Sequence, residues 1–378
     1  MRLFWLIFLP AAAYQLVAIF AEIRHIWLRY RLRRQPKTFR PGISVLKPLR
    51  GSDPGMYSAF VSQVRQKYPA FEVLFGVSSI DDPAALEVRR LQQAFPKASI
   101  RLIAGCSDAA NRKVGVLENL SRYAKYPILL VNDGDIKVEP DYLESVVSPL
   151  ADPRIGIVTC PYRPYPQSAA TTWEALGIAT DFIPSTLTAP LAGVREFGLG
   201  STLVFRKCDL EEIGGFKTIG DFLADDYHLA RSITGLGKRA LLSPYIVETS
   251  LGDANWSGIW QHQLRWARTI RISRGDGFAG IPITQSGIWA ALACALGAWP
   301  VALALLVLRL CSAVISAGLV LRSLRIALLA WLAPFWDWYA FAIWIASYAS
   351  HDVRWRGRSL TIDSSGRIEQ KTKDSVLV

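Results

Sequence analysis

Asp133 and Asp135 stand one residue apart, directly after the apolar run 128–131. An extended segment points alternate side chains the same way, so both carboxylates can face one point. Two such charges about 4 Å apart would repel by roughly 4 kcal/mol at an effective dielectric constant of about 20. A divalent cation reverses that sign, and Mg²⁺ or Mn²⁺ on one or two carboxylates completes its shell with water and phosphates. The pattern therefore indicates either a cation site, with Gly134 leaving room for a ligand, or an acidic surface turn.

Two further acidic pairs could meet the same point. Asp81 and Asp82 follow a second apolar run, 71–77, where they either contact a ligand or cap the helix that comes next. Asp225 and Asp226 lie in a stretch that reads as a helix start. The plain reading of the pair is a solvated helix start.

Basic and polar residues that could face a phosphate lie in two places. Asn111 and Lys113 precede a predicted helix, where Lys113 is either a phosphate contact or a surface charge. Arg265 and Trp266 belong to the basic stretch 262–271, close to the apolar C-terminal region. A guanidinium offers paired donors to phosphate oxygens, although basic residues beside a membrane need no such role. The indole either lines a binding site or lies at the membrane interface.

Strands that alternate with helices must position these residues. Strands are predicted over 43–46, 71–77, 100–103 and 128–131, and helices over 54–67 and 83–94. This alternation favours a doubly wound, parallel α/β sheet. Ligands of such sheets bind at the carboxyl ends of the strands, so one crevice is expected to collect the acidic pairs.

Apolar residues, 51% of the whole chain, concentrate near its two ends. Residues 3–23 contain no Lys or Arg and are long enough to cross a bilayer. An uncleaved anchor is favoured over a signal peptide, because no convincing cleavage site follows and a basic cluster does. The positive-inside rule places that cluster, and the α/β domain after it, in the cytoplasm.

The C-terminal region predicts further membrane segments. Residues 287–308 read as one crossing and 328–349 as a second, while 311–321 is a re-entrant helix, an interfacial helix or a third span. Residues 277–288 are expected to lie along the membrane interface. The expected organisation is an anchor over 1–24, a cytoplasmic α/β domain over 41–275, interfacial and transmembrane helices over 276–352, and a cytoplasmic basic tail over 353–378.

Charge and composition exclude several other classes. The net charge is +12, but much of the basic excess flanks the apolar ends, which favours a membrane surface over a nucleic acid. We therefore expect no nucleic-acid partner. The five cysteines form no CxxC pair and the four histidines are dispersed, so neither a disulfide framework nor a zinc site is indicated.

As a set, these motifs resemble the family 2-type (GT-A) glycosyltransferases, and most closely their ceramide glucosyltransferase branch, family 21. That branch has three separated aspartates, matched here by DDP at 81–83, NDGDIKV at 132–138 and ADDYHLA at 224–230. Its (Q/R)xxRW motif is similar to HQLRW at 262–266, with His262 as the one departure, and NRKVGVLENL and the segment that ends in WRGR also match. The similarity runs from about residue 14 to about residue 358. It implies a GT-A fold: a doubly wound, mainly parallel α/β sheet with N-terminal and C-terminal transmembrane helices.

The resemblance implies a UDP-sugar donor and a Mg²⁺ or Mn²⁺ cofactor. Asp133, with Asp135, would hold the metal on the diphosphate. Asp226 would be the general base, with Asp225 beside it, and Arg265 would stabilise the pyrophosphate as the bond breaks. Trp266 would complete the catalytic set. Donor contacts would come from Asp81, Asp82, Asn111, Lys113, Asp133, His262 and Arg265.

One base and no carboxylate nucleophile suit a single displacement with inversion. The acceptor would be the hydroxyl of a membrane lipid, most simply ceramide. Bacterial hopanoid N-acetylglucosaminyltransferases belong to the same neighbourhood, which makes bacteriohopanetetrol the alternative acceptor and the bacterial inner membrane the expected location. A processive polysaccharide synthase, a polyprenyl-phosphate transferase and an inactive membrane scaffold are the remaining alternatives.

Overall fold

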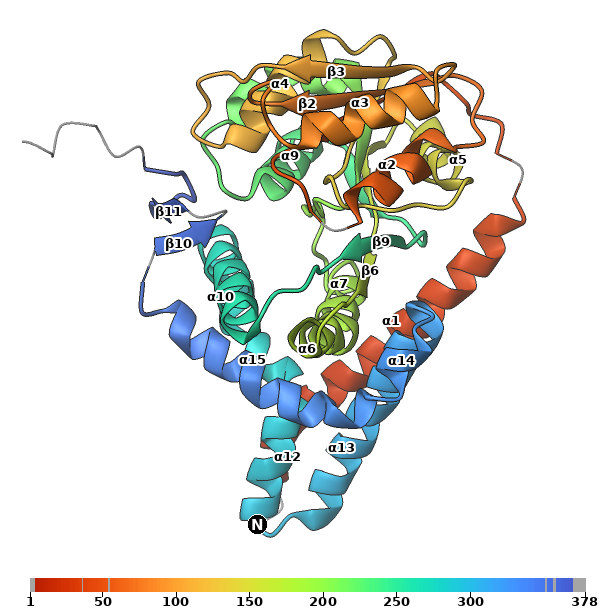
Figure 1. Ribbon diagram of the computed structural model, residues 1–378. Coiled ribbons are helices and arrows are strands. Elements are labelled where there is room, and N and C mark those ends of the chain that lie inside the picture. Colours follow the sequence, from red (N-terminus) through yellow and green to blue (C-terminus); the bar gives the residue numbers. More distant parts are fainter. Residues whose placement is uncertain (1–3, 36, 54, 351, 356–357, 370–378) are drawn as a thin grey trace, which may run out of the picture.

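The computed structural model describes residues 4–369 apart from residues 36, 54, 351, 356 and 357. An α/β domain occupies one side of the molecule and a group of apolar helices the other (Figure 1). Helix α1 (Leu9–Arg33) runs along the apolar helices, and α10 (Trp256–Ser273) lies between the two parts.

A seven-stranded sheet, in the order β3-β2-β1-β4-β7-β5-β8, forms the centre of the α/β domain. Its strands are β1 (Ile43–Pro48), β2 (Phe71–Val77), β3 (Ile100–Ala104), β4 (Ile128–Val131), β5 (Ile155–Thr159), β7 (Leu203–Arg206) and β8 (Arg239–Leu242). β7 is antiparallel to β4 and β5, and the other neighbouring strands are parallel. The mainly parallel sheet predicted from the sequence is therefore confirmed.

The strands were predictable because each is a short, buried apolar run. All residues of β4 are buried, and its bounds equal the predicted ones. β1 extends two residues beyond its prediction and β3 one residue.

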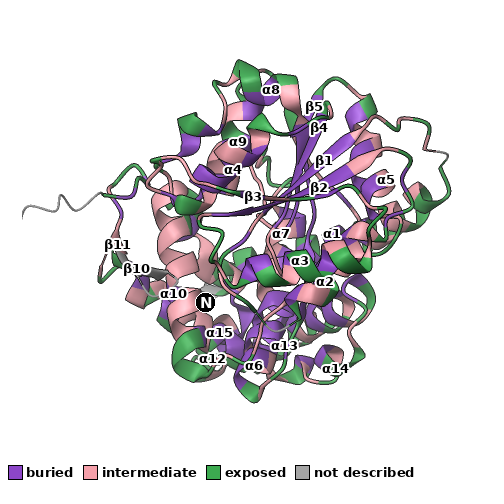
Figure 2. Ribbon diagram, turned by 45° about the horizontal axis from the view of Figure 1, so that its top comes forward, coloured by how far each residue is buried: buried purple, intermediate pink, exposed green. Residues whose placement is uncertain are grey.

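Helices cover both faces of the sheet, as a doubly wound fold requires (Figure 2). The helices of this domain are α2 (Met56–Val64), α3 (Ala84–Ala94), α4 (Arg112–Arg122), α5 (Tyr142–Val147), η2 (Ser148–Ala151), α8 (Lys207–Glu212), η4 (Phe216–Ile219) and α9 (Asp225–Thr234). Alternate residues of β1 serve the two faces: Val45 packs in one core with Met56, and Leu46 in the other with Leu117 and Leu229.

Two small sheets lie outside the central one. β6 (Tyr162–Tyr165) pairs in parallel with β9 (Val247–Ser250) on the side of the domain that faces the helices. β10 (Asp352–Trp355) and β11 (Arg358–Thr361) form an antiparallel hairpin near the C-terminus.

The remaining helices form the apolar part of the molecule. They are η1 (Phe4–Phe8), α6 (Ala169–Gly177), η3 (Ile178–Phe182), α7 (Ile183–Thr188), α11 (Gly275–Ala279), η5 (Ile281–Thr284), α12 (Ser286–Ala295), α13 (Trp299–Val314), η6 (Ile315–Val320), α14 (Leu324–Ala327), η7 (Ala330–Leu332) and α15 (Ala333–Ser347). Two segments of the described chain are long and apolar enough to cross a membrane, Trp5–Arg33 and Trp299–Val320.

The N-terminal helix extends past residue 24, where the predicted anchor ends. It runs to Arg33, and Arg29 donates to the backbone oxygens of Val320 at 2.7 Å and Leu319 at 2.8 Å. These carbonyls belong to the last turn of η6, where orphan acceptors attract a guanidinium. Part of the basic cluster therefore joins two helix ends, a role that composition alone did not indicate.

The single crossing predicted over 287–308 is wrong. The chain turns at Gly297, whose φ of 74° suits glycine, so α12 and α13 form a hairpin. The segment 311–321, predicted as a separate short element, continues α13 through the π-helical η6. The interfacial stretch expected at 277–288 contains the short helices α11 and η5.

The second crossing predicted over 328–349 is shorter than expected. Its main helix, α15, has 15 residues, about 22 Å at 1.5 Å per residue, which is less than the hydrocarbon thickness of a bilayer. It lies across the α12–α13 hairpin (Figure 1). Trp331, Phe335 and Trp338 expose more than half of their surface there, as residues of an interfacial helix do.

The C-terminal segment folds back onto the α/β domain. Ile368 donates its N–H to the Asp221 oxygen at 2.8 Å, and Leu223 donates to the Gly366 oxygen at 3.2 Å. Leu223 also joins Val353, Ile362 and Ile368 in a small apolar cluster. The basic tail expected over 353–378 is thus partly ordered against the loop before α9, while residues 356–357 and 370–378 lie outside the described residues.

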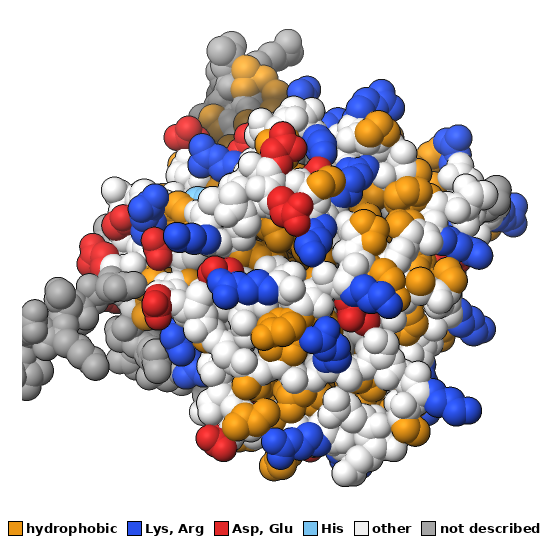
Figure 3. Space-filling view, turned by 90° about the horizontal axis from the view of Figure 1, so that it is seen from above, with side chains coloured by type: hydrophobic (Ala, Val, Ile, Leu, Met, Phe, Trp, Pro, Cys, Tyr) orange, Lys and Arg blue, Asp and Glu red, His pale blue; other side chains and the backbone are white. Residues whose placement is uncertain are grey.

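The surface differs between the two parts. On the face of the α/β domain seen from above, Lys and Arg alternate with Asp and Glu (Figure 3). Exposed large apolar side chains are instead common on α1 and α13, for example Leu16, Phe20 and Leu303. The two parts thus present surfaces suited to water and to lipid.

Candidate active site

A cavity of about 1260 Å³ lies between the carboxyl edge of the sheet, α10 and α15. Arg50, Ser78 and Asp133 line it just beyond the ends of β1, β2 and β4, whereas Trp336 and Tyr339 line it from α15. Because β7 runs antiparallel, the loop before it arrives at the same edge. The cavity therefore reaches from the sheet to the apolar helices.

The Asp-Gly-Asp segment leaves β4 at this edge and is held from behind by Lys47 of β1. The buried ammonium donates to Asn132 Oδ1 at 2.8 Å and to the Asp133 backbone oxygen at 2.8 Å. Burial lowers the pKa of Lys47 to about 7, although the carboxylates of Asp135 and Asp133 favour its charge. A Cβ on Gly134 would meet Leu49 Cδ2 at 3.1 Å, so glycine allows the turn to pack closely.

Lys113 stands between two of the carboxylates. Its Nζ lies 3.0 Å from Asp133 Oδ1 and 3.1 Å from Asp225 Oδ2. Burial opposes its charge, but Asp133 and then Asp225 raise the pKa of Lys113 above its ordinary value. Asn111 caps α4 by accepting from the Lys113 N–H at 3.1 Å and donates to the Phe222 oxygen at 2.9 Å. Lys113 is thus a residue of the site rather than a surface charge.

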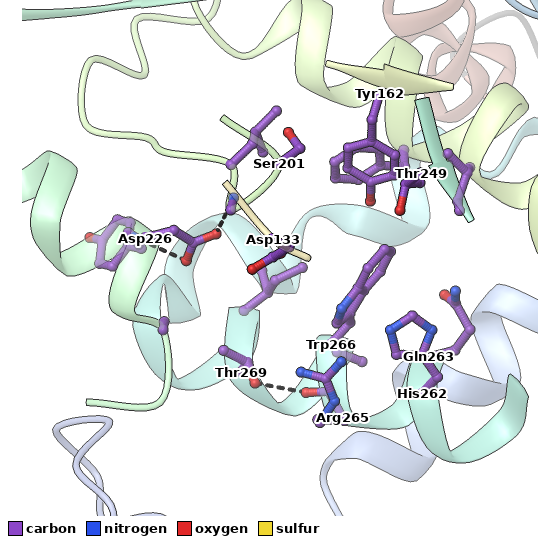
Figure 4. Close-up of a pocket in the computed structure, with 18 of the residues that line it drawn as sticks. Asp133, Tyr162, Ser201, Asp226, Thr249, His262, Gln263, Arg265, Trp266 and Thr269 are labelled. Carbon is purple, nitrogen blue, oxygen red and sulfur yellow. Dashed lines mark hydrogen bonds between the residues drawn. The ribbon is translucent and has the colours of Figure 1, made fainter. Parts of the chain in front are cut away.

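Asp226 lies at the first turn of α9, opposite Asp133 in the cavity (Figure 4). Its carboxylate accepts the Gly200 N–H at 2.9 Å and the Tyr227 N–H at 2.8 Å. Burial, and then the neighbouring charge of Asp225, raises the pKa of Asp226 to about 6. Near neutral pH this carboxylate is a stronger base than an exposed aspartate.

The two glycines of the loop before β7 lie against this carboxylate. A Cβ on Gly198 would stand 2.5 Å from the Asp226 backbone oxygen, and one on Gly200 would stand 3.3 Å from Asp133 Oδ2. Position 198 therefore requires glycine, whereas a side chain at position 200 would crowd the Asp133 carboxylate. The close backbone contact of Gly198 is with Asp226 of α9.

Asp135 faces β9, where its carboxylate is hydrogen-bonded by the Thr249 hydroxyl. Burial, and then the charge of Asp133, raises its pKa above the ordinary value. Both carboxylates of the motif line the cavity.

These carboxylates fit a cation that is shared with a ligand rather than enclosed by the protein. Within the described chain, no group of three or more His, Cys, Asp or Glu side chains could hold a metal. Asp133, with 44% of its side chain exposed, and Asp135 could supply one or two oxygens. Mg²⁺ and Mn²⁺ are commonly bound in this way, with water and substrate phosphates as the other ligands.

Helix α10 supplies Arg265 and Trp266 to the cavity (Figure 4). None of the carboxylates that the structure describes forms an ion pair with Arg265. Burial lowers the pKa of Arg265, while Asp133 and Asp226 favour its charge. An unpaired guanidinium in a partly buried site is well suited to bind an anion. The Trp266 ring packs with Phe182 and Tyr162, at centroid distances of 5.8 and 6.5 Å.

His262 is bound by an acidic residue that the sequence did not single out. Its Nδ1 lies 2.6 Å from Oε1 of Glu174 on α6, and Gln263 Nε2 donates to the same oxygen at 2.8 Å. His262 and Glu174 both line the cavity.

Three of the residues predicted to contact a donor are not among those that line the cavity: Asp81, Asp82 and Asn111. Asp82 Oδ1 accepts from the N–H of Ala84, the first residue of α3, at 3.0 Å and from Gly51 N–H at 2.9 Å. Asp81 is exposed and contacts Ser79. Asp82 thus holds the loop that carries Arg50, and Asn111 holds the backbone of Lys113, because carboxylates and amides readily satisfy helix N-termini.

Lys47, Glu174 and Thr249 are the site residues that sequence reasoning missed. A lysine inside an apolar strand and a glutamate inside an apolar helix are unusual, and that signal could have indicated Lys47 and Glu174. Thr249 gave no comparable signal.

The solved structures include a similar fold. The mannosyltransferase PcManGT from Pyrobaculum calidifontis, in complex with GDP-Man and Mn²⁺, superposes with a TM-score of 0.53 and 22% identity, covering 90% of this chain and 97% of that one. At this identity the likeness shows the fold alone.

Curated relatives are ceramide glucosyltransferases. Ceramide glucosyltransferase 1 of Caenorhabditis elegans is 28% identical over 249 residues, 65% of this chain and 53% of the relative. Ceramide glucosyltransferase 3 of the same organism is 26% identical over 262 residues, 65% of this chain and 54% of the relative. The chain thus spans about half the length of these relatives.

The family model described as Glycosyl transferase family 21 matches residues 4–368. This match includes the sheet, the cavity and the apolar helices that precede and follow the α/β domain in the sequence. The resemblance drawn from the separated aspartates and HQLRW is confirmed, and the chain belongs to glycosyl transferase family 21.

Proposed function

We propose that this protein transfers a sugar from a UDP-sugar to the hydroxyl of a membrane lipid, with ceramide as the leading acceptor. The observation that carries the proposal is the continuity of one cavity. It contains Lys113, Asp133, Asp226 and Arg265 at the sheet, and Trp336 and Tyr339 at the apolar helices. A water-soluble, anionic donor and a lipid alcohol could therefore meet inside it.

The part of the cavity next to the sheet contains cationic groups that could bind a diphosphate and carboxylates that could hold its divalent cation. Arg265 is free to pair with phosphate oxygens, and Lys113 can exchange a carboxylate for a phosphate. The relative with a similar fold was solved with Mn²⁺ and a nucleotide sugar, which supports a divalent cation here. Asp133 and Asp135 would hold it, and the cation would neutralise charge on the departing UDP.

Asp226 is the proposed general base. The Gly200 and Tyr227 N–H groups fix its carboxylate, and its raised pKa favours proton transfer near neutral pH. A base that takes the acceptor proton while the lipid oxygen attacks the sugar needs no enzyme-bound sugar. We therefore propose single displacement with inversion.

Ceramide is favoured over other acceptors by the names of the curated relatives. The two candidate spans and the interfacial α15 support a multi-pass protein whose cavity faces the membrane surface. We also propose that the protein lies in a bacterial inner membrane with its α/β domain in the cytoplasm. The basic residues that follow the N-terminal apolar segment favour this orientation.

Lipid mass spectrometry of a heterologous host, with wild type and Asp226→Asn, tests the function. We expect a hexose added to ceramide with the wild type and none with the variant. Detection of an N-acetylhexosamine on bacteriohopanetetrol would identify that hopanoid, rather than ceramide, as the acceptor. UDP release without any glycosylated lipid would refute lipid transfer.

A further inference from the structure

We propose that His262, oriented by Glu174, binds a second hydrogen-bonding group of the lipid acceptor, a hydroxyl or amide N–H other than the reacting hydroxyl. This inference rests on the proposed function and names a feature that its acceptor must have. It also replaces the expectation that His262 contacts the donor.

The imidazole is held in one orientation. Glu174 is buried, with 2% of its side chain exposed, and its Oε1 accepts at 2.6 Å from His262 Nδ1. The Trp266 ring packs on the imidazole with a centroid distance of 4.6 Å. A ring fixed by a carboxylate and an aromatic neighbour is ordered before a ligand arrives.

This orientation assigns the roles of the two ring nitrogens. A carboxylate can only accept, so Nδ1 carries the hydrogen and the neutral ring has its lone pair on Nε2. Among the residues that the structure describes, no group hydrogen-bonds Nε2. The side chain is 32% exposed and lines the cavity, so Nε2 is available to accept from an O–H or N–H of a ligand.

The position of His262 favours the acceptor over the donor. Figure 4 shows Trp266 between His262 and Asp133, which places the imidazole away from the proposed metal site. The cavity residues contributed by α6 and α15 include Gly177, Trp336 and Tyr339, an apolar and aromatic wall that suits a lipid. The carboxylate of Glu174 would also repel a diphosphate, whereas it tolerates a neutral hydrogen-bond donor beside it.

The experiment compares pairs of acceptors in wild type and His262→Phe. One pair is a short-chain ceramide and a primary alcohol of matched chain length, which lacks the amide and the second hydroxyl. The other pair is bacteriohopanetetrol and a hopanoid with one hydroxyl. We expect His262→Phe to lower kcat/KM by about 10- to 100-fold for the acceptor with several polar groups, mainly through its KM. The single-hydroxyl acceptor and the KM of the UDP-sugar should change less than about threefold.

Two further variants separate recognition from structure. Gln263→Met removes the other hydrogen bond to Glu174 and should preserve the preference between acceptors. His262→Gln, which retains a hydrogen-bonding side chain, should recover part of it. Thermal unfolding of each variant shows whether the fold survives.

The outcomes are distinguishable. An equal loss on both members of a pair, or a rise in donor KM instead, overturns the role of His262 while leaving lipid transfer intact. A wild type that glycosylates none of these lipids overturns the proposed function and this inference together.

Discussion

Among the ion pairs of the described residues, those of Lys113 and Arg309 differ in their access to solvent. Lys113 stands between Asp133 and Asp225, with side chains that are 17%, 44% and 11% exposed. Arg309 of α13 pairs with Asp337 of α15, with 3% and 1% exposed, and also donates to the Thr180 backbone oxygen. The first cluster opens onto the cavity, whereas the second is enclosed between helices.

The difference indicates what each pair can do. A carboxylate with open space beside it can exchange the ammonium for a cation or let it bind a phosphate instead. Asp337 also accepts the Gly287 N–H at 2.8 Å, so its oxygens are engaged by groups from α12 and α13. Breaking such a buried pair leaves an uncompensated charge, which is strongly destabilising. The open cluster should therefore control activity and the closed one stability.

Replacing the proposed base should have the largest effect. Asp226→Asn keeps the shape and the Gly200 contact but removes the proton acceptor. We expect kcat to fall by about 10²- to 10⁴-fold, measured as sugar transfer at saturating donor and acceptor. Asp152→Asn, at a partly exposed aspartate outside the cavity that pairs with Arg154, is the matched control and should retain kcat. Near wild-type transfer by Asp226→Asn would assign the base elsewhere.

Breaking the closed pair should lower stability rather than chemistry. Arg309→Met leaves Asp337 buried without its guanidinium and should reduce the free energy of unfolding by about 3–5 kcal/mol. The double variant Arg309→Met/Asp337→Leu should recover much of that loss. Thermal unfolding in detergent measures both, and a double variant no better than the single one would show that the pair itself stabilises the fold.

Removing the cation of the open cluster should lower activity more than stability. Lys113→Met removes the ammonium between Asp133 and Asp225, and we expect about a tenfold or larger loss of kcat/KM for the UDP-sugar. Its unfolding midpoint should fall much less than that of Arg309→Met, because the carboxylates left behind can be solvated. If instead the two variants lost stability equally, the contrast between open and closed clusters would be wrong.

The pH dependence of activity tests the proposed role of Asp226, which lies next to the open cluster. A general base must be ionised, and the pKa of Asp226 is raised to about 6. The kcat/KM for wild type should therefore be level above about pH 6 and fall as pH decreases through that value, approaching tenfold per unit. A profile that is flat down to pH 5 would show that this carboxylate is not the base in the free enzyme.

The smallest expected effect concerns the C-terminal segment, which touches the loop before Asp225. Ile368→Ala removes apolar contacts with Leu223 but keeps the backbone hydrogen bond to Asp221. We expect kcat to fall less than tenfold, with donor and acceptor KM unchanged. A change in acceptor KM alone would instead place this segment at the lipid end.

The sequence by itself determined the local elements and the kinds of chemistry available. β4 was predicted to the residue because four buried apolar residues in a row suit an interior strand. The Asp-Gly-Asp turn was predicted to lie at its end, where the carboxyl edges of parallel strands meet. The helix break at Gly297 was missed, since a single glycine in an apolar run does not distinguish a hairpin from a continuous span.

Only the tertiary structure decided which partner each charged side chain has. Asp82 and Asp133 both follow strands, yet one caps α3 while the other faces Lys113. Glu174 meets His262 across 88 residues of chain, a contact that no local pattern encodes. Periodicity and composition act over a few neighbouring residues, whereas ion pairs and cavities depend on how distant segments pack. That packing placed Asp226, Arg265 and the apolar wall in one cavity.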